Sequence, residues 1–269
     1  MEVIETESDI KEEKHPLEHI QDGSIEFSNV SFYYPKSNDA SLSDIDLTIK
    51  SGEKVGIIGS TGSSKSTLVQ LIPRLYDVTS GEVLVGGKNV KDYSLKALRD
   101  QISYVLQANT LFSGTIRSNI QWGKEDASDE EIIDVLKKSQ AWEFVGNYDD
   151  PLEKEVEQGG RNFSGGQKQR LTIARSLIKR PKILILDDST SAVDMSTDRK
   201  IQDMLKREFP ETTVLMITQR ISSIENFDKI IVMEKGRIDS IGSHQELLET
   251  SEIYKDVYRS QVGEVADEQ

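Results

Sequence analysis

The sequence predicts an α/β fold with an inserted helical segment. Residues 183–186 (Ile-Leu-Ile-Leu) are apolar at every position, as expected of a parallel strand that is covered on both faces. A second aliphatic run, at residues 55–58, leads into glycines and then into a helical pattern, which gives the order strand, turn, helix. From about residue 108 to residue 180 the pattern becomes helical, and Ser128 with Glu131 forms a capping-box start within it.

The remaining elements follow from similar local patterns. A helix is expected over residues 65–75, ending near Pro73, and Ser243 begins a last helical region. Turns are expected at the Gly86–Gly87 pair, which marks a hairpin, and at Gly236. Further strands are predicted at residues 25–34, 45–49, 102–106, 214–218 and 229–233.

The chain is predicted to contain one folded domain between two short flanks. Residues 1–22 are acidic and poor in large apolar side chains, so they are expected to form a linker or disordered lead-in. Residues 263–269 are expected to form a flexible tail. The folded domain therefore spans residues 23–262, with the helical insertion at about 108–180.

The composition excludes several classes of function. The 269 residues carry a formal net charge of −14, which argues against a nucleic-acid binder that relies on a basic surface. Cysteine is absent, so neither a disulfide framework nor a thiolate metal site is possible. No apolar run approaches the roughly 18 residues of a membrane span. The domain in this sequence is therefore expected to be soluble. The sequence is equally compatible with a domain taken from a larger membrane protein.

A glycine- and serine-rich loop links the strand at 55–58 to the helix that follows. Its residues are Gly59, Ser60, Thr61, Gly62, Ser63, Ser64, Lys65, Ser66 and Thr67. In a P-loop of this kind the backbone N–H groups bind the β-phosphate, Lys65 reaches the β- and γ-phosphates, and the Ser66 hydroxyl binds Mg²⁺. An ordinary Gly/Ser turn is the alternative. Ser64 stands where a glycine is usual, and its side chain is expected to strain the loop and weaken nucleotide binding.

The carboxylate that ends the apolar strand is the second half of this site. Asp187 follows residues 183–186 directly, where P-loop proteins place a carboxylate that holds Mg²⁺. A strand-end aspartate that only caps a helix is the alternative. Lys65 and Asp187 lie too far apart in sequence for a small GTPase-like core, and the helical insertion accounts for the difference.

A second phosphate-binding helix start lies about a hundred residues after the first. Ser164, Gly165, Gly166 and Gln167 follow Phe163 and open a helical pattern. Bare backbone N–H groups and the positive end of a helix dipole favour phosphate oxygens there. A plain helix cap is the alternative reading. Because one nucleotide does not require two such elements, we expect this one to serve a nucleotide that another subunit holds.

Together these residues resemble the nucleotide-binding domain of an ATP-binding-cassette (ABC) exporter over about residues 24–262. The resemblance implies a P-loop NTPase (RecA-like) core, an antiparallel β subdomain and an inserted helical subdomain. It also implies ATP and Mg²⁺ as cofactors and a place at the cytoplasmic face of the cell membrane. In this family two domains pack head to tail, and each ATP lies between one P-loop and the other domain's signature helix.

Further positions match the family residue by residue. Tyr34 matches the aromatic residue that stacks on adenine, and Gln107 matches the glutamine that touches Mg²⁺ and relays the nucleotide state to the membrane domains. Glu157 matches the exporter loop that meets the transmembrane part. Residues 191–194 match the D-loop, which crosses the dimer interface.

Two catalytic positions depart from the family pattern. Asp188 replaces the usual glutamate that activates water, and Gln219 replaces the usual histidine. A shorter carboxylate loses reach, and a carboxamide cannot carry a positive charge or pass a proton. The pattern therefore resembles the degenerate half of heterodimeric bacterial multidrug ABC transporters. A slow homodimeric ATPase is the alternative, and a soluble DNA-associated ABC ATPase fits less well because no coiled-coil insertion or basic surface is visible.

Overall fold

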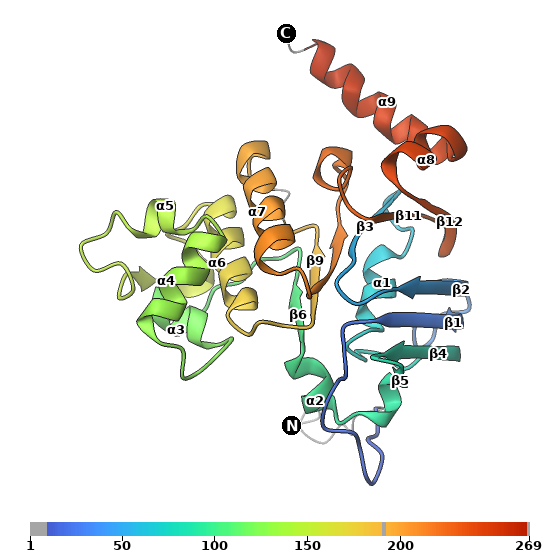
Figure 1. Cartoon of the computed structure of the whole chain (residues 1–269), viewed down its shortest axis with the longest axis horizontal. Helices are drawn as coiled ribbons and strands as arrows, with labels where there is room; N and C mark the ends of the chain where they lie inside the picture. The colour runs from blue at the N-terminus through green and yellow to red at the C-terminus, as the bar shows by residue number, and fades with distance from the viewer. Residues whose placement is uncertain (1–9, 190–191, 268–269) are drawn as a thin grey trace.

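The computed structural model describes residues 10–189 and 192–267, and its centre is a six-stranded sheet (Figure 1). The strand order is β12-β11-β3-β10-β9-β6, in which β12 is antiparallel to its neighbour and the others pair in parallel. The strands are β3 (Lys54–Gly59), β6 (Ile102–Val105), β9 (Ile183–Asp187), β10 (Thr213–Ile217), β11 (Lys229–Glu234) and β12 (Arg237–Gly242).

A smaller antiparallel sheet stands beside the first, in the order β2-β1-β4-β5. Its strands are β1 (Ile25–Phe32), β2 (Leu42–Ile49), β4 (Ser80–Val85) and β5 (Lys88–Asn89). The Gly86–Gly87 pair forms the predicted hairpin turn between β4 and β5, with positive φ at both residues. Helix α1 (Lys65–Gln70) lies between the two sheets, as Figure 1 shows, and buries Leu68 and Val69 in their shared core.

The predicted helical insertion forms a lobe on the side of the large sheet opposite the small one (Figure 1). Its elements are β7 (Gly114–Thr115), α3 (Ile116–Gln121), α4 (Asp129–Lys138), α5 (Trp142–Val145), β8 (Glu155–Val156), η3 (Gln158–Gly160) and α6 (Gly165–Leu177). The capping box predicted at Ser128 is present at the start of α4. The other helices are η2 (Val90–Asp92), α2 (Leu95–Asp100), α7 (Met195–Glu208), η4 (Ile221–Ser223), α8 (His244–Thr250) and α9 (Glu252–Asp267). Within the described residues, none of the helices is both long and apolar enough to pass through a membrane.

Strand β9 explains why its sequence is apolar throughout. Ile183 and Ile185 pack into the core shared with α1 and the small sheet. Leu184 and Leu186 pack into the opposite core, which contains the helical lobe, α7 and the C-terminal helices. Successive side chains of a strand point to opposite faces, and here both faces are covered. The predicted α/β architecture is confirmed.

Three local expectations differ from the structure. Helix α1 ends at Gln70, and turns replace the helix that was expected to continue to residue 75; Arg74 there has a positive φ of 50°. The described part of the 1–22 segment packs on the domain, with Ile20 buried and Leu17 in a β-bridge with Tyr93. Residues 263–267 lie in α9, where a flexible tail was expected.

A buried lysine fixes the start of β3, the strand that leads into the P-loop. The Lys54 ammonium donates to the carbonyl oxygens of Gly52, Phe209 and Thr212 at 3.0, 2.9 and 2.6 Å. Only 6% of Lys54 is exposed. Burying a charge is costly unless hydrogen bonds satisfy it, and these carbonyl groups do so while joining β3 to the segment between α7 and β10.

We expect Lys54→Met to lower the free energy of unfolding by about 2–4 kcal/mol, because it leaves several buried carbonyl groups without a donor. Lys50→Met, at an exposed position four residues earlier, is the control and is expected to change stability little. Denaturant unfolding of both variants measures the difference. Equal stabilities for the two would show that the Lys54 hydrogen bonds contribute nothing.

Candidate functional site

The P-loop lies between β3 and α1, at the edge where the parallel strands end. Gly59 has a φ of 154°, and a Cβ there would collide with the Met233 carbonyl oxygen, so glycine is required. The Lys65 ammonium donates to the carbonyl oxygens of Gly59 and Ser60, both at 2.8 Å. Burial lowers the pKa of Lys65, although Asp187 and Asp188 nearby act in the opposite direction.

The Asp187 carboxylate is held at both oxygens. The Ser66 hydroxyl donates to Oδ1 at 3.1 Å, and the Tyr104 hydroxyl donates to Oδ2 at 2.8 Å. Asp187 is buried at the end of β9, and Tyr104 comes from the neighbouring strand β6. Burial, followed by the charge of Asp187, raises the pKa of Tyr104, so the phenol stays a hydrogen-bond donor. Hydroxyl and carboxylate oxygens are ligands that suit Mg²⁺, so this pair fits the predicted cation.

Asp188 and Gln219 line the same cleft as the P-loop. The cleft has a volume of about 330 Å³ and includes Lys65, Gln107 and Asp187. The Gln107 carboxamide donates to Asp188 Oδ2 at 3.0 Å. Burial, the largest effect, raises the pKa of Asp188, while the Gln107 hydrogen bond acts to lower it. Residues from four separate segments therefore meet at one opening.

Ser64 adopts a backbone conformation that favours glycine. Its φ and ψ are 69° and 25°, which places it in the left-handed region directly before α1. A non-glycine residue is strained there because its Cβ crowds the following carbonyl group. The strain expected from the sequence at this position is therefore present in the backbone of the P-loop.

Tyr34 lies beside the P-loop helix. Its hydroxyl is 3.0 Å from Thr67 Oγ1, and its ring makes edge contacts with Phe32 and Tyr76 at centroid distances of 4.9 and 5.3 Å. These contacts fix the ring next to Thr67, one of the residues that line the cleft.

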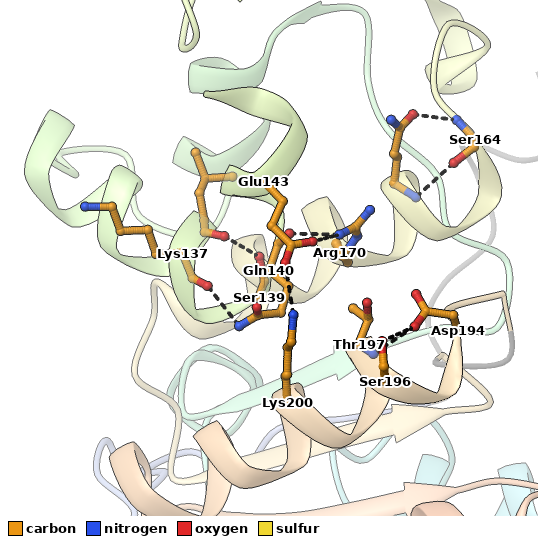
Figure 2. Close-up of polar contacts among 12 residues, drawn as sticks. Lys137, Ser139, Gln140, Glu143, Ser164, Arg170, Asp194, Ser196, Thr197 and Lys200 are labelled. Carbon is orange, nitrogen blue, oxygen red and sulfur yellow. Dashed lines mark hydrogen bonds and ion pairs between the residues drawn. The ribbon is translucent and has the colours of Figure 1, made fainter. Parts of the chain in front are cut away.

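The second predicted phosphate-binding element starts helix α6. The Ser164 hydroxyl accepts from the Gln167 N–H at 3.3 Å, and the Gln167 side chain accepts from the Ser164 N–H at 2.9 Å (Figure 2). This capping box leaves Ser164 and Gly165 exposed to solvent. A Cβ at Gly166 would lie 2.8 Å from the Ala192 carbonyl oxygen, so the close approach of the segment before α7 requires a glycine.

The two predicted phosphate-binding elements open onto different parts of the surface. Ser164, Gly165 and Gly166 line a hollow together with Arg170 and Asp194. None of the residues that line this hollow also lines the P-loop cleft. The helix start therefore does not open into the P-loop cleft.

Ion pairs connect the helical lobe to the core near this hollow. Glu143 of α5 accepts from Arg170 of α6 at 3.0 Å and from Lys200 of α7 at 3.2 Å (Figure 2). The Arg170 guanidinium also donates to the Gln140 carbonyl oxygen at 2.9 Å and stacks over the Phe144 ring. One carboxylate thus joins a helix of the lobe to a helix of the core.

Comparison with known proteins decides the family. Residues 42–191 match the family model described as "ABC transporter", which covers more than half of the chain. The chain belongs to the ABC transporter family. The family and the P-loop NTPase fold predicted from the sequence are therefore confirmed.

Relatives of this ABC domain are longer proteins. It is 45% identical over 267 residues to "Uncharacterized ABC transporter ATP-binding protein YfiB" of Bacillus subtilis (strain 168), covering 99% of this chain and 46% of that protein. It is also 45% identical over 239 residues to "Putative multidrug export ATP-binding/permease protein YgaD" of the same strain, covering 89% of this chain and 41% of that protein. Among solved structures, a bacterial Atm1-family ABC exporter with ATP bound matches with a TM-score of 0.92 and 31% identity, covering 97% of this chain and 46% of that one. The chain therefore spans less than half the length of these relatives.

The ABC domain brings some of the predicted site residues together and keeps others apart. The P-loop residues from Thr61 onward, Gln107, Asp187, Asp188 and Gln219 share the cleft, apart from Ser63, which is buried beside it. Of the predicted signature residues, Ser164, Gly165 and Gly166 line a separate hollow, and Gln167 completes the capping box with Ser164. Glu157 is exposed on the helical lobe. In the predicted D-loop, residue 191 lies outside the described residues, while Asp194 caps α7.

Tyr104 is the site residue that sequence reasoning missed. It lies on β6, three positions before Gln107. A tyrosine on a strand usually packs its ring against the core, so its sequence context provided no reason to assign it to the site. Only the pairing of β6 with β9, which sets Tyr104 opposite Ile185, brings its hydroxyl to Asp187. The one available signal was that two parallel strands ending at the same edge place their last side chains close together.

We expect Ser64→Gly to raise the free energy of unfolding of the ABC domain by about 0.5 kcal/mol. Relief of the left-handed strain, about 1–2 kcal/mol, exceeds the entropy that glycine adds to the unfolded chain, about 0.4–1 kcal/mol. Ser60→Gly is the control, because Ser60 is not in the left-handed region and gains no relief. Chemical denaturation is the measurement, and a Ser64→Gly protein no more stable than the Ser60→Gly protein would contradict the account.

The raised pKa of Asp188 predicts a pH-dependent effect of Asp188→Asn. A raised pKa means that folding disfavours the ionised Asp188 carboxylate. Below the pKa of aspartate in the unfolded chain, about 3.9, the group is protonated and does not reduce stability. As the pH rises from there through the folded pKa, ionisation of Asp188 lowers the free energy of unfolding. We therefore expect Asp188→Asn to raise the unfolding temperature at pH 7 and to lose this advantage as the pH approaches 4. Thermal unfolding across this range, with the exposed Asp39→Asn as control, tests the sign. A gain that is independent of pH would contradict it.

Proposed function

We propose that this chain is the ATP-binding domain of an ABC exporter and works with a second ABC domain. One observation supports this most directly: the P-loop cleft and the exposed Ser164 helix start face different openings of the same chain. A phosphate-binding helix start that its own cleft does not use is suited to a nucleotide on a partner. In this proposal the two domains pack head to tail, and each ATP lies between one P-loop and the opposite signature helix.

The P-loop cleft is proposed to bind ATP with Mg²⁺. Lys65 supplies a positive charge for the β- and γ-phosphates, and the loop supplies backbone N–H groups. Ser66 and Asp187 hold oxygen atoms 3.1 Å apart that suit Mg²⁺, with Gln107 at the edge of the same cleft. The cation would neutralise phosphate charge when bound. Tyr34, beside Thr67, is proposed to stack on the adenine ring.

Hydrolysis at this cleft is proposed to be slow. Asp188 offers a carboxylate one methylene shorter than glutamate, and its Oδ2 accepts from Gln107, so it is poorly placed to take a proton from water. Gln219 lines the cleft and has a carboxamide that can hydrogen-bond a γ-phosphate without accepting or carrying a proton. Meanwhile the capped helix start formed by Ser164, Gly165, Gly166 and Gln167 is proposed to complete a partner's site. The partner is therefore proposed to be a different ABC domain with the full catalytic pair.

The transmembrane partner is proposed to dock beside Gln107. A groove of about 350 Å³ lies between β6, the segment after it and α6, and Leu106 and Ala108 line it on either side of Gln107. Leu106 and Trp122 are 52% and 68% exposed, and Trp122 stacks on Phe112 at 4.3 Å. Clustered exposed apolar side chains of this size mark interaction sites.

The proposed contacts with the transmembrane part indicate how the domain would act within a longer transporter. Glu157, exposed on the helical lobe, is proposed as a second contact with the transmembrane part. Closure of the two ABC domains on ATP would then pull on the membrane helices through both regions. The name of the relative YgaD mentions multidrug export, so we propose a multidrug-type exporter with this domain at the cytoplasmic face of the cell membrane. The net charge of −14 gives no support to a nucleic-acid partner.

We expect the double variant Asp188→Glu, Gln219→His to hydrolyse ATP at least about tenfold faster than the parent chain, because a well-placed general base contributes about 10²–10⁴ in rate. Phosphate release from the full 269-residue chain, at a series of chain concentrations, measures this. Asp39→Glu with Gln245→His makes the same chemical changes at exposed positions and is the control. Adding Lys65→Ala to the active variant should remove the gain, which locates it in this cleft.

Two results would contradict the proposal. Brisk ATP hydrolysis by the parent chain alone would favour a homodimeric ATPase. A double variant that binds ATP and dimerises yet stays as slow as the parent would show that Asp188 and Gln219 are not what limits turnover.

A further inference from the structure

The segment that follows β10 and carries Gln219 is held by the C-terminal helix. The Gln261 carboxamide of α9 donates from Nε2 to the Gln219 carbonyl oxygen at 2.6 Å. The same carboxamide accepts at Oε1 from the Ile221 N–H at 2.9 Å. One side chain therefore satisfies an acceptor and a donor two residues apart, as a neighbouring strand would do.

The opposite side of this segment is held by helix α7 and the residues before it. The Arg220 guanidinium donates to the Val193 carbonyl oxygen at 3.0 Å. The Ser223 hydroxyl donates to Asp198 of α7 at 2.5 Å, in a buried contact. These bonds hold residues 220 and 223, whereas the Gln219 carbonyl group accepts its hydrogen bond from α9. Gln261 therefore binds the Gln219 backbone directly, in addition to the bonds that hold Thr218 and Arg220 on either side of it.

Helix α9 has an anchor of its own that does not involve Gln261. Tyr254 is fully buried in the core that contains α7 and α8, and its hydroxyl lies 2.8 Å from His244 Nδ1. Gln261 follows seven residues later, which is two helical turns, so it lies on the same face as Tyr254. Loss of the Gln261 hydrogen bonds is therefore expected to free the Gln219 carbonyl group and the Ile221 N–H while α9 stays docked.

We propose that Gln261 is a positioning residue that holds Gln219 where it meets the γ-phosphate, so that the C-terminal helix sets how well this cleft distinguishes ATP from ADP. The inference rests on the proposed function, in which Gln219 contacts the γ-phosphate. ADP lacks that phosphate, so a displaced Gln219 weakens ATP binding and leaves ADP binding unchanged. A general loss of folding would weaken both nucleotides together.

Displacement of a fluorescent nucleotide from the full chain, in the presence of Mg²⁺, gives the affinities for ATP and ADP. Gln261→Leu removes both hydrogen bonds and is expected to weaken ATP binding by about three- to tenfold, the effect of one or two hydrogen bonds, with ADP affinity unchanged. Gln261→Glu can accept from the Ile221 N–H but cannot donate to the Gln219 carbonyl oxygen, so it is expected to show the same selective loss. Gln245→Leu, an exposed position on α8, is the matched control and should behave as the parent.

A double-mutant cycle shows whether Gln261 acts through Gln219. Gln219→Ala should weaken ATP binding selectively, and adding Gln261→Leu to it should change ATP affinity by less than about twofold. Parent-like ATP affinity in both Gln261 variants, an equal loss for ATP and ADP, or a full Gln261→Leu effect in the Gln219→Ala background would each overturn the inference alone. If Gln219→Ala itself leaves ATP affinity unchanged, the γ-phosphate contact of the proposed function fails, and the inference fails with it.

Discussion

The structure depends on parallel strands that end together at one edge of the large sheet. Ile217 at the end of β10 pairs in register with both Ile57 of β3 and Asp187 of β9. This register fixes where the segments after each strand begin, and so brings Ser66 and Asp187 within hydrogen-bond distance although α1 and β9 are far apart in sequence. The edge formed by the carboxyl ends of strands is where open α/β sheets bind ligands. The P-loop cleft is a direct result of this arrangement.

The two predicted phosphate-binding elements belong to different parts of the molecule. The P-loop belongs to the core, whereas α6 belongs to the helical lobe, which Figure 1 shows on the side of the large sheet away from the small one. Gly166 allows the segment at Ala192 to pack closely against the start of α6, and that segment leads into α7 of the core. The exposed helix start is therefore held by both parts of the molecule. This placement leaves the α6 helix start and the P-loop cleft open at separate places on the surface, as the proposed partnership with a second ABC domain requires.

The sequence predicted the parts of the fold that depend on local pattern. The apolar run of β9, the capping box at Ser128 and the loop from Gly59 to Thr67 all follow from residue type and spacing over a few positions. Contacts between distant side chains were not predictable in this way. Tyr104 and Gln261 each reach their partners only through the tertiary structure, and a lone polar side chain in a strand or helix gives no local signal of its partner. Helix α1 also ends earlier than its sequence pattern predicted. It packs between the two sheets, and tertiary packing can override helical propensity.

The link between the helical lobe and α7 has a consequence for how firmly the two parts are joined. Glu143 and Lys200 are about half exposed, whereas Arg170 is mostly buried. Dissolved electrolyte screens exposed charges beyond about 10 Å at 0.1 M and beyond about 3 Å at 1 M, so the Glu143–Lys200 contact weakens as ionic strength rises. The contact with Arg170 lies within the lobe and is better shielded. Concentrated electrolyte should therefore weaken this one surface link, while the apolar core that the lobe shares with α7 keeps the two parts together.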